Sequence, residues 1–314
     1  MALYLIRKVI KPLHKLNHMN KRREFLKTAA TGIALTAISG KILGAGSKDL
    51  FGTSEQKRKF GLQLYTLRDD MPKDPRGILK KVAAMGYKYI ESFEHDKLGM
   101  FWGMSNVEFK RYLDELGLNL VSSHCNINKD FDRKAEEAAA IGMKYLICPS
   151  IDNEKGMSVD DCKKAADLFN TKGEVCKKNG IRFAYHNHDG PFISRGNHLI
   201  PEEYLIKNTN PELVDFEMDI YWVVTAGQDP LVWLKKYPNR FKLGHLKDRK
   251  KNTPLSEREV SVNLGTGSID FHKICHIAKE HGMTYFIVEQ EKYEGSSPLA
   301  AAKADADYLK KLKF

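Results

Sequence analysis

Side chains that can bind metal ions stand at the ends of four apolar segments of the sequence. The segments 182–188, 214–220, 241–247 and 284–290 end on or near His186, Asp219, His245 and Glu289. An unpaired charge in apolar surroundings is costly, so one shared divalent cation explains the set economically. Two imidazoles and two carboxylates suit Mn, Co, Ni or Zn better than Ca, which prefers oxygen ligands throughout. For any one of these residues alone, a hydrogen-bonded histidine or a salt bridge near the core is as good an interpretation as a metal ligand.

Other polar residues end the remaining apolar segments in the same way. Glu91 ends 87–93, His124 ends 118–124, and Lys247 follows His245 by two positions. His188 follows His186 by two positions, and alternate residues of a strand point to the same side. His188 is therefore an alternative to His186 as the fourth metal ligand.

The order of the segments predicts the elements that carry these residues. Eight candidate strands recur along the chain, at 60–66, 87–93, 118–124, 144–149, 182–188, 214–220, 241–247 and 284–290. Amphipathic helical stretches lie between them, for example at 77–85, 107–116, 131–141 and 158–178. Four strands follow a glycine that is typical of a helix end, namely Gly86, Gly142, Gly180 and Gly282.

Strict alternation of strands and helices predicts a single α/β domain. Parallel strands joined by right-handed crossovers, eight in number over about 250 residues, indicate a closed (β/α)8 barrel, a TIM barrel, over residues 59–314. An open doubly wound sheet is the alternative. No G-x-G-x-x-G motif follows the first strand, so the usual nucleotide-binding signature of that alternative is missing. In such a barrel the chemistry lies at the carboxyl ends of the strands.

The basic excess of the chain is confined to its beginning. The formal net charge is +11, with 51 basic and 40 acidic residues. Nine of the basic residues and one acidic residue, Glu24, lie in residues 1–46, which leaves 42 basic and 39 acidic residues in the remainder. A nearly neutral body gives no electrostatic footprint for nucleic acid. The five cysteines are odd in number and irregularly spaced, and we interpret them as buried thiols.

Residues 1–46 have the pattern of an export signal. Lys21-Arg22-Arg23-Glu24-Phe25-Leu26-Lys27 precedes an apolar run over 28–42 and then small residues. The run is too short to span a membrane. The paired arginines followed by Phe-Leu-Lys resemble a twin-arginine signal, which is an address read by a receptor. We expect export to the periplasm, a linker over 47–58, and no stable membrane insertion once the signal is removed.

Six motifs in order resemble the sugar phosphate isomerase/epimerase family, the xylose isomerase-like TIM barrels, which include inosose dehydratase and tagatose 3-epimerase. They are 61–91 (GLQLYTLRDDMPKDPRGILKKVAAMGYKYIE), 180–192 (GIRFAYHNHDGPF), 218–230 (MDIYWVVTAGQDP), 245–248 (HLKD), 263–271 (NLGTGSIDF) and 286–291 (FIVEQE). The resemblance covers roughly residues 58–312. It implies one metal ion at His186, Asp219, His245 and Glu289. The epimerases carry glutamate where this chain has His186, and histidine where it has Trp222.

The resemblance implies chemistry on a sugar next to its carbonyl group. A bound metal polarises the carbonyl, and a base within hydrogen-bond reach removes the neighbouring carbon-bound proton. Glu289 is the expected base, and His124 or Lys247 the expected acid. The expected activity is a metal-dependent isomerase or epimerase that acts through an enediolate-type intermediate. Because His186 replaces one of the two epimerase glutamates, a lyase, a dehydratase or a 3-keto-glycoside-cleaving enzyme is the alternative.

The expected partner is a small sugar without phosphate. Phosphorylated sugars are scarce outside the cytoplasm, and no strand end carries a cluster of Lys and Arg. Candidates for substrate binding are Glu91, His188, Trp222, Tyr65 and Trp102, although core packing explains each aromatic residue equally well. A nuclease of the endonuclease IV type would need more metal ligands and a basic surface. A non-catalytic sugar-binding barrel stays open as a further alternative, as does a homo-oligomer.

Overall fold

The computed structural model describes residues 59–151, 154, 156–293 and 295–313. The predicted export signal (1–46) and the predicted linker (47–58) lie outside these described residues. Within the described ranges, no helix has both the length and the apolar character needed to cross a membrane.

Eight parallel strands close into a barrel, as the alternating pattern predicts. Around the barrel, each strand pairs with its sequence neighbour, and β10 closes on β1 with Ile287 beside Gly61. The strands are β1 (Gly61–Gln63), β2 (Tyr89–Phe93), β3 (Asn119–His124), β4 (Tyr145–Cys148), β5 (Arg182–His186), β6 (Val214–Asp219), β7 (Phe241–Leu246) and β10 (Tyr285–Val288). The prediction of a (β/α)8 barrel is confirmed.

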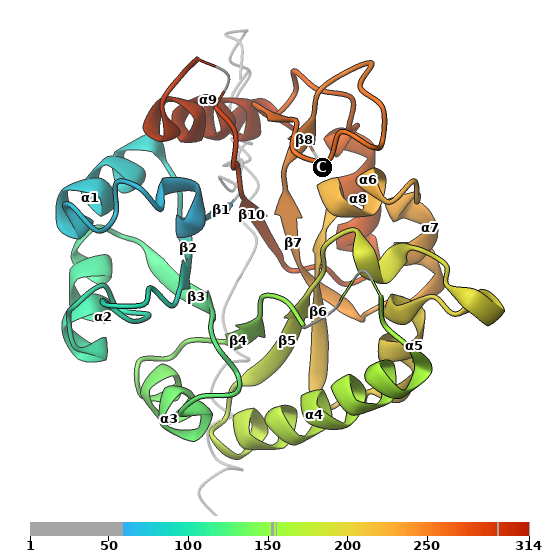
Figure 1. Ribbon diagram of the computed structural model, residues 1–314. Coiled ribbons are helices and arrows are strands. Elements are labelled where there is room, and N and C mark those ends of the chain that lie inside the picture. Colours follow the sequence, from blue (N-terminus) through green and yellow to red (C-terminus); the bar gives the residue numbers. More distant parts are fainter. Residues whose placement is uncertain (1–58, 152–153, 155, 294, 314) are drawn as a thin grey trace, which may run out of the picture. The chain divides into compact units, whose positions relative to one another are not determined.

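Helices lie outside the ring of strands, as Figure 1 shows. They are α1 (Pro75–Met85), α2 (Asn106–Glu115), α3 (Phe131–Ala140), α4 (Val159–Lys178), α5 (Pro201–Asn208), α6 (Ile220–Thr225), α7 (Pro230–Lys236), α8 (Phe271–Glu280) and α9 (Pro298–Lys311). Short 3-10 turns, η1 (Leu64–Leu67), η2 (Gly190–Phe192) and η3 (Gly196–His198), belong to the connections.

Local signals start and stop the helices where the sequence places them. Helix α1 begins after Asp74, whose carboxylate accepts a hydrogen bond of 2.9 Å from the backbone N–H of Gly77. It ends at Gly86, whose φ of 99° favours glycine over residues with a side chain. The chain can then turn back into β2.

Apolar side chains fill the part of the barrel interior nearer the amino ends of the strands. They are here called the apolar plug. Its members are Val121, Tyr145, Ile147, Ala184, Leu243 and Ile287, with Tyr89 and Tyr285 packed against them. A larger apolar core lies between the strands and the surrounding helices. Two packed layers around a filled barrel are the expected way to bury both faces of a parallel sheet.

Several strands end earlier than the sequence predicts. Strand β1 stops at Gln63, because the Gln63 side chain accepts a hydrogen bond of 3.0 Å from the N–H of Tyr65 and caps η1. Tyr65 therefore lies on a 3-10 turn and not on a strand. Strand β5 also ends before His188, and β10 ends before Glu289. Two short antiparallel strands, β8 (Asp248–Arg249) and β9 (Ser261–Val262), were not predicted.

Candidate metal centre and cavity

Polar side chains lie above the apolar plug because alternate residues of a strand face the same way. On β7, Leu243 belongs to the plug, and His245 and then Lys247 follow at steps of two. The same alternation on the other strands produces a group here called the charged layer, consisting of Glu91, His124, His186, Glu217, Asp219, His245, Lys247 and Glu289. All eight side chains are buried, with exposed fractions of at most 8%.

The four predicted metal ligands come together in the charged layer. His186, Asp219, His245 and Glu289 each offer one ligand atom, and these atoms lie within 4.8 Å of one another. The Nδ1 atom of His245 is 3.4 Å from Oε2 of Glu289 and 3.8 Å from Oδ2 of Asp219. We call these residues the four-residue group.

The donor atoms of this group fit a metal ion. Nδ1 of His186, Nδ1 of His245 and Oδ2 of Asp219 are buried and have no partner in hydrogen-bond geometry among the described residues. They do have ion-pair neighbours: Glu217 lies 3.2 Å from Nδ1 of His186, and Lys247 lies 3.0 Å from Oδ2 of Asp219. Burial, followed by repulsion from His245, holds the pKa of His186 well below its usual range, so its imidazole is neutral. A neutral imidazole and a carboxylate are the forms that bind a metal ion. Burial disfavours the charged form of His245, but attraction to Glu217 and Glu289 outweighs it and raises the pKa of His245, so an ion binding there would displace a proton.

A buried ammonium group lies beside the carboxylates of the four-residue group. Nζ of Lys247 is 3.0 Å from Oδ2 of Asp219, 2.7 Å from Oε2 of Glu289 and 2.5 Å from Oε1 of Glu291. Burial opposes the charged form of Lys247, but attraction to Asp219 and Glu289 outweighs it and raises the pKa of the ammonium. Lys247 thus stays charged and neutralises part of the acidic group.

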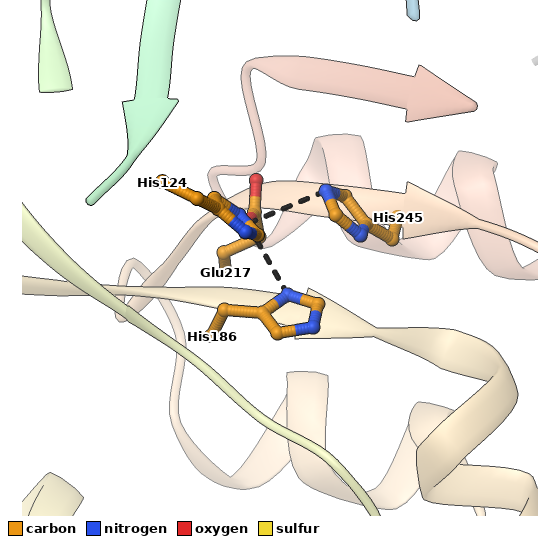
Figure 2. A group of neighbouring side chains, drawn as sticks. All are labelled: His124, His186, Glu217 and His245. Atoms are coloured by element: carbon orange, nitrogen blue, oxygen red, sulfur yellow. Dashed lines mark hydrogen bonds and ion pairs between the residues drawn. The ribbon is translucent and has the colours of Figure 1, made fainter. Parts of the chain in front are cut away.

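A second cluster lies directly beside the first, around Glu217 (Figure 2). Oε2 of Glu217 is 2.8 Å from Nε2 of His124, 3.2 Å from Nδ1 of His186 and 3.4 Å from Nε2 of His245. Glu217 is absent from the residues that we predicted from the sequence. The period-two signal was available, because Glu217 precedes Asp219 by two positions on β6.

Burial and neighbouring charges shift the pKa values of His124 and Glu217. Burial disfavours the charged form of His124, but attraction to Glu91 and the hydrogen bond to Glu217 outweigh it and raise the pKa of His124 to about 9. Burial, together with repulsion from Glu91, raises the pKa of Glu217 to about 7. His124 is therefore an imidazolium at neutral pH, paired with the carboxylates of Glu91 and Glu217.

Glu91 is not among the described side chains that line the cavity above the charged layer, and its role in substrate binding stays a prediction. The residue is fully buried, and Oε1 lies 2.7 Å from Nε2 of His245 and 3.2 Å from Nε2 of His124. Its position in the middle of β2 places the carboxylate inside the barrel, below the level of the strand ends.

A cavity of about 450 Å³ opens above the charged layer. Its wall combines two aromatic rings, three imidazoles and four carboxylates: Tyr65, Phe93, His124, His186, His188, Glu94, Asp96, Glu289 and Glu291. Tyr65 is 39% exposed and packs edge-on against Phe93, with ring centroids 5.3 Å apart. Among the described lining residues, Lys129 is the one lysine or arginine.

His186 and His188 take different positions at this cavity. His186 is 3% exposed and belongs to both clusters of ligand atoms. The side chain of His188 is 34% exposed, and its Nδ1 lies 3.3 Å from Oε2 of Glu154. The geometry therefore favours His186 as the metal ligand and His188 as a wall residue.

The two tryptophans predicted to contact substrate do not line the cavity. Trp102 is 3% exposed, and its Nε1–H donates a hydrogen bond of 3.0 Å to Oγ of Ser92. Trp222 is 6% exposed, with Nζ of Lys247 5.3 Å and Cζ of Arg258 5.1 Å from its ring centroid. Trp102 itself belongs to the segment between β2 and α2, and Trp222 lies on α6, so both rings pack inside the protein and their contact with substrate stays a prediction.

Comparison with known proteins agrees with this architecture. The family model described as xylose isomerase-like TIM barrel matches residues 79–312. The chain belongs to the xylose isomerase-like TIM barrel family. Members of this superfamily are enzymes, and they include isomerases, epimerases and dehydratases.

Two relatives of this xylose isomerase-like barrel are about equally similar in sequence. An inosose dehydratase from Clostridium perfringens is 30% identical over 176 residues, which cover 52% of this chain and 58% of that protein. This chain therefore matches somewhat over half the length of that curated relative. The solved structure of a sugar phosphate isomerase/epimerase from Parabacteroides distasonis is 30% identical, with a TM-score of 0.69 over 86% of this chain and 100% of that chain.

A more distant structure shares the fold of this xylose isomerase-like barrel. The IOLI protein, solved with a bound zinc atom, is 18% identical and has a TM-score of 0.66 over 82% of this chain and 99% of that chain. At this identity the likeness concerns the fold alone.

Proposed function

We propose that this chain is a metal-dependent enzyme that removes the proton next to the carbonyl group of a sugar without phosphate and then eliminates a group from the adjacent carbon. The observation that carries the proposal is the asymmetry of the charged layer. Glu289 at the end of β10 is the one carboxylate of the four-residue group that lines the cavity, and the corresponding position on β5 is the neutral imidazole of His186.

The four-residue group would hold the metal ion, since its two imidazoles and two carboxylates bring four buried ligand atoms within 4.8 Å of one another. The ion, when bound, would polarise the carbonyl oxygen of the substrate and so acidify the neighbouring carbon-bound proton. A solved neighbour of the same fold carries zinc. Mn, Co, Ni and Zn are all compatible with two imidazoles and two carboxylates.

The chain supplies one base and one acid on different sides of the cavity. Glu289 follows β10, while His124 ends β3, three strands away around the barrel. Attraction to Lys247, acting against burial, holds the pKa of Glu289 well below its usual range, so Glu289 is ionised, which is the form that a base requires. The imidazolium of His124 can protonate the departing oxygen. A carbon–hydrogen and a carbon–oxygen bond break, a carbon–carbon double bond forms, and the leaving group departs with its proton.

Isomerisation or epimerisation is the second candidate. The 30% identical structure from Parabacteroides distasonis favours it, because that protein is described as a sugar phosphate isomerase/epimerase. In this case the proton would return to carbon, with an imidazole in place of the second carboxylate of a two-base mechanism. The 30% identical inosose dehydratase favours elimination.

The substrate class rests on the charge of the cavity. Glu94, Asp96, Glu289 and Glu291 line it, against Lys129 as the basic residue among the described lining side chains. A phosphate group would meet these carboxylates without an arginine clamp among the described lining residues. We therefore propose a neutral sugar or 3-keto-glycoside, stacked against Tyr65 and Phe93.

The test uses the purified full chain, stripped of metal and reconstituted with Mn, Co, Ni or Zn. Free sugars, inososes and 3-keto-glycosides are incubated with it in D2O and followed by NMR. Elimination gives a new carbon–carbon double bond and a released group; epimerisation gives deuterium on an intact carbon skeleton. Metal-dependent epimerisation would replace the first candidate by the second. Sugar binding without either reaction in every metal form would leave a sugar-binding barrel.

We also propose export through the twin-arginine pathway, on the sequence of residues 21–27 alone. Replacing Arg22 and Arg23 with lysine should retain the chain in the cytoplasmic fraction. Unchanged fractionation of this variant would contradict the proposal.

A further inference from the structure

We propose that Glu91 positions the metal ligand His245, by holding the proton of the imidazole on Nε2 so that Nδ1 is free to bind the ion. The proposal rests on the metal site of the proposed function and assigns a role to a residue outside the four-residue group. Glu91 would not touch the ion or the substrate.

The contacts of His245 separate its two ring nitrogens. Nε2 lies 2.7 Å from Oε1 of Glu91, a normal hydrogen-bond distance. Nδ1 points the other way, 3.4 Å from Oε2 of Glu289 and 3.8 Å from Oδ2 of Asp219, and makes no hydrogen bond to the described residues. A neutral imidazole has one N–H and one lone pair, so a proton kept on Nε2 leaves the lone pair of Nδ1 for a metal ion.

Glu91 is itself held by neighbouring strands. The amide of Gln63 on β1 donates a hydrogen bond of 2.8 Å to Oε1, and the hydroxyl of Ser122 on β3 donates one of 2.6 Å to Oε2. Nε2 of His124 lies 3.2 Å from Oε1. Side chains on β1, β3 and β7 therefore fix a carboxylate on β2, and a fully buried carboxylate is tolerated only with such partners.

Glu217 is less suited to this role, although it is equally buried and lies in the same layer. Its Oε2 is 3.4 Å from Nε2 of His245 but 2.8 Å from Nε2 of His124, and its Oε1 has no hydrogen-bond partner among the described residues. The shorter contact to His245 comes from Glu91. The geometry thus distinguishes two carboxylates that the sequence does not.

The first test compares zinc affinity between the wild-type full chain and the variant Glu91→Gln, by competition with a chromogenic chelator. Loss of the anionic partner should weaken zinc binding about 10- to 100-fold. The matched control is Glu202→Gln on α5, a fully buried glutamate whose oxygens lack hydrogen-bond partners among the described residues. The control should bind zinc like the wild type. An unchanged zinc affinity in Glu91→Gln would overturn the proposal.

A second measurement does not depend on the folding of Glu91→Gln. Nitrogen NMR of the zinc-loaded, 15N-histidine-labelled wild type should show a histidine with Nδ1 bound to zinc and a proton on Nε2, and this signal should disappear in His245→Gln. Zinc on Nε2 of His245 would overturn the proposal even if Glu91→Gln does not fold. If the wild type binds no zinc, Mn, Co or Ni, the metal site of the proposed function fails together with this inference.

Discussion

The two halves of the barrel interior use the same strands for opposite purposes. The apolar plug is filled by Val, Leu, Ile, Ala and Tyr, which gain stability by leaving water. Further towards the carboxyl ends of the strands, the barrel holds the imidazoles, carboxylates and ammonium of the charged layer, where burial is costly. On β10 the change falls between Ile287 and Glu289, and on β5 between Ala184 and His186.

The comparison shows how one barrel separates stability from chemistry. The charged layer is tolerated because nearly every charge in it has a close counter-charge, such as Lys247 beside Asp219 and Glu289. Replacing such groups by apolar residues would often stabilise a protein. Their presence therefore points to function, and changes in the two halves should have different consequences.

The largest effect should come from Glu289→Gln in the charged layer. The amide keeps the shape of the carboxylate but cannot accept the carbon-bound proton, so turnover should fall about 10²- to 10⁴-fold. Steady-state rates on the substrate found in the D2O screen measure the loss, and the melting temperature checks that the fold persists. Turnover within about threefold of the wild type would assign the base to another residue.

The next effect should come from Leu243→Ala in the apolar plug. Leu243 is fully buried, and its truncation should lower the free energy of unfolding by about 2–5 kcal/mol through lost burial and a cavity. Urea denaturation measures this change. Zinc affinity of the folded variant should stay near the wild-type value. If the free energy of zinc binding falls by more than the free energy of unfolding, the apolar plug and the charged layer are coupled. The two halves would then not have separate roles.

The smallest effect concerns a buried carboxylate away from both halves, Asp305 on α9. Burial raises the pKa of Asp305 to about 7, offset only in part by the N–H of Leu264. Because the folded chain holds this proton more tightly than the unfolded chain, stability is lost as pH rises from about 4 through about 7. Asp305→Asn removes that loss, so at about pH 8 the variant should gain about 1–3 kcal/mol relative to the wild type.

The relevant measurement for Asp305 is urea denaturation of both proteins at about pH 5 and about pH 8. The exposed carboxylate of Asp114 on α2, changed to asparagine, is the control and should not alter the pH dependence. Parallel pH profiles for wild type and Asp305→Asn would contradict the prediction.

The sequence alone determined the barrel and the four-residue group. Period-two apolar runs, helix caps and glycine stops identify eight strand–helix units, and closure of eight such units follows from their number and handedness. Strand ends must then meet at one face, and the resemblance to the xylose isomerase-like family selects His186, Asp219, His245 and Glu289 among the polar residues there. The barrel and the meeting of its strand ends are consequences of local pattern and of a topology with few alternatives.

Only the tertiary structure decided what each polar residue faces. Strand lengths set by hydrogen bonds, as at Gln63, determine whether a residue lies inside the barrel or at its mouth, and this separates Glu91 from Tyr65. Trp102, in the segment after β2, and Trp222, on α6 beside Arg258, are both buried, and no periodic signal predicts how such connections pack. The partner of each ring nitrogen of His245 depends on groups 154 and 44 residues away, at Glu91 and Glu289, which only the closed barrel brings into contact.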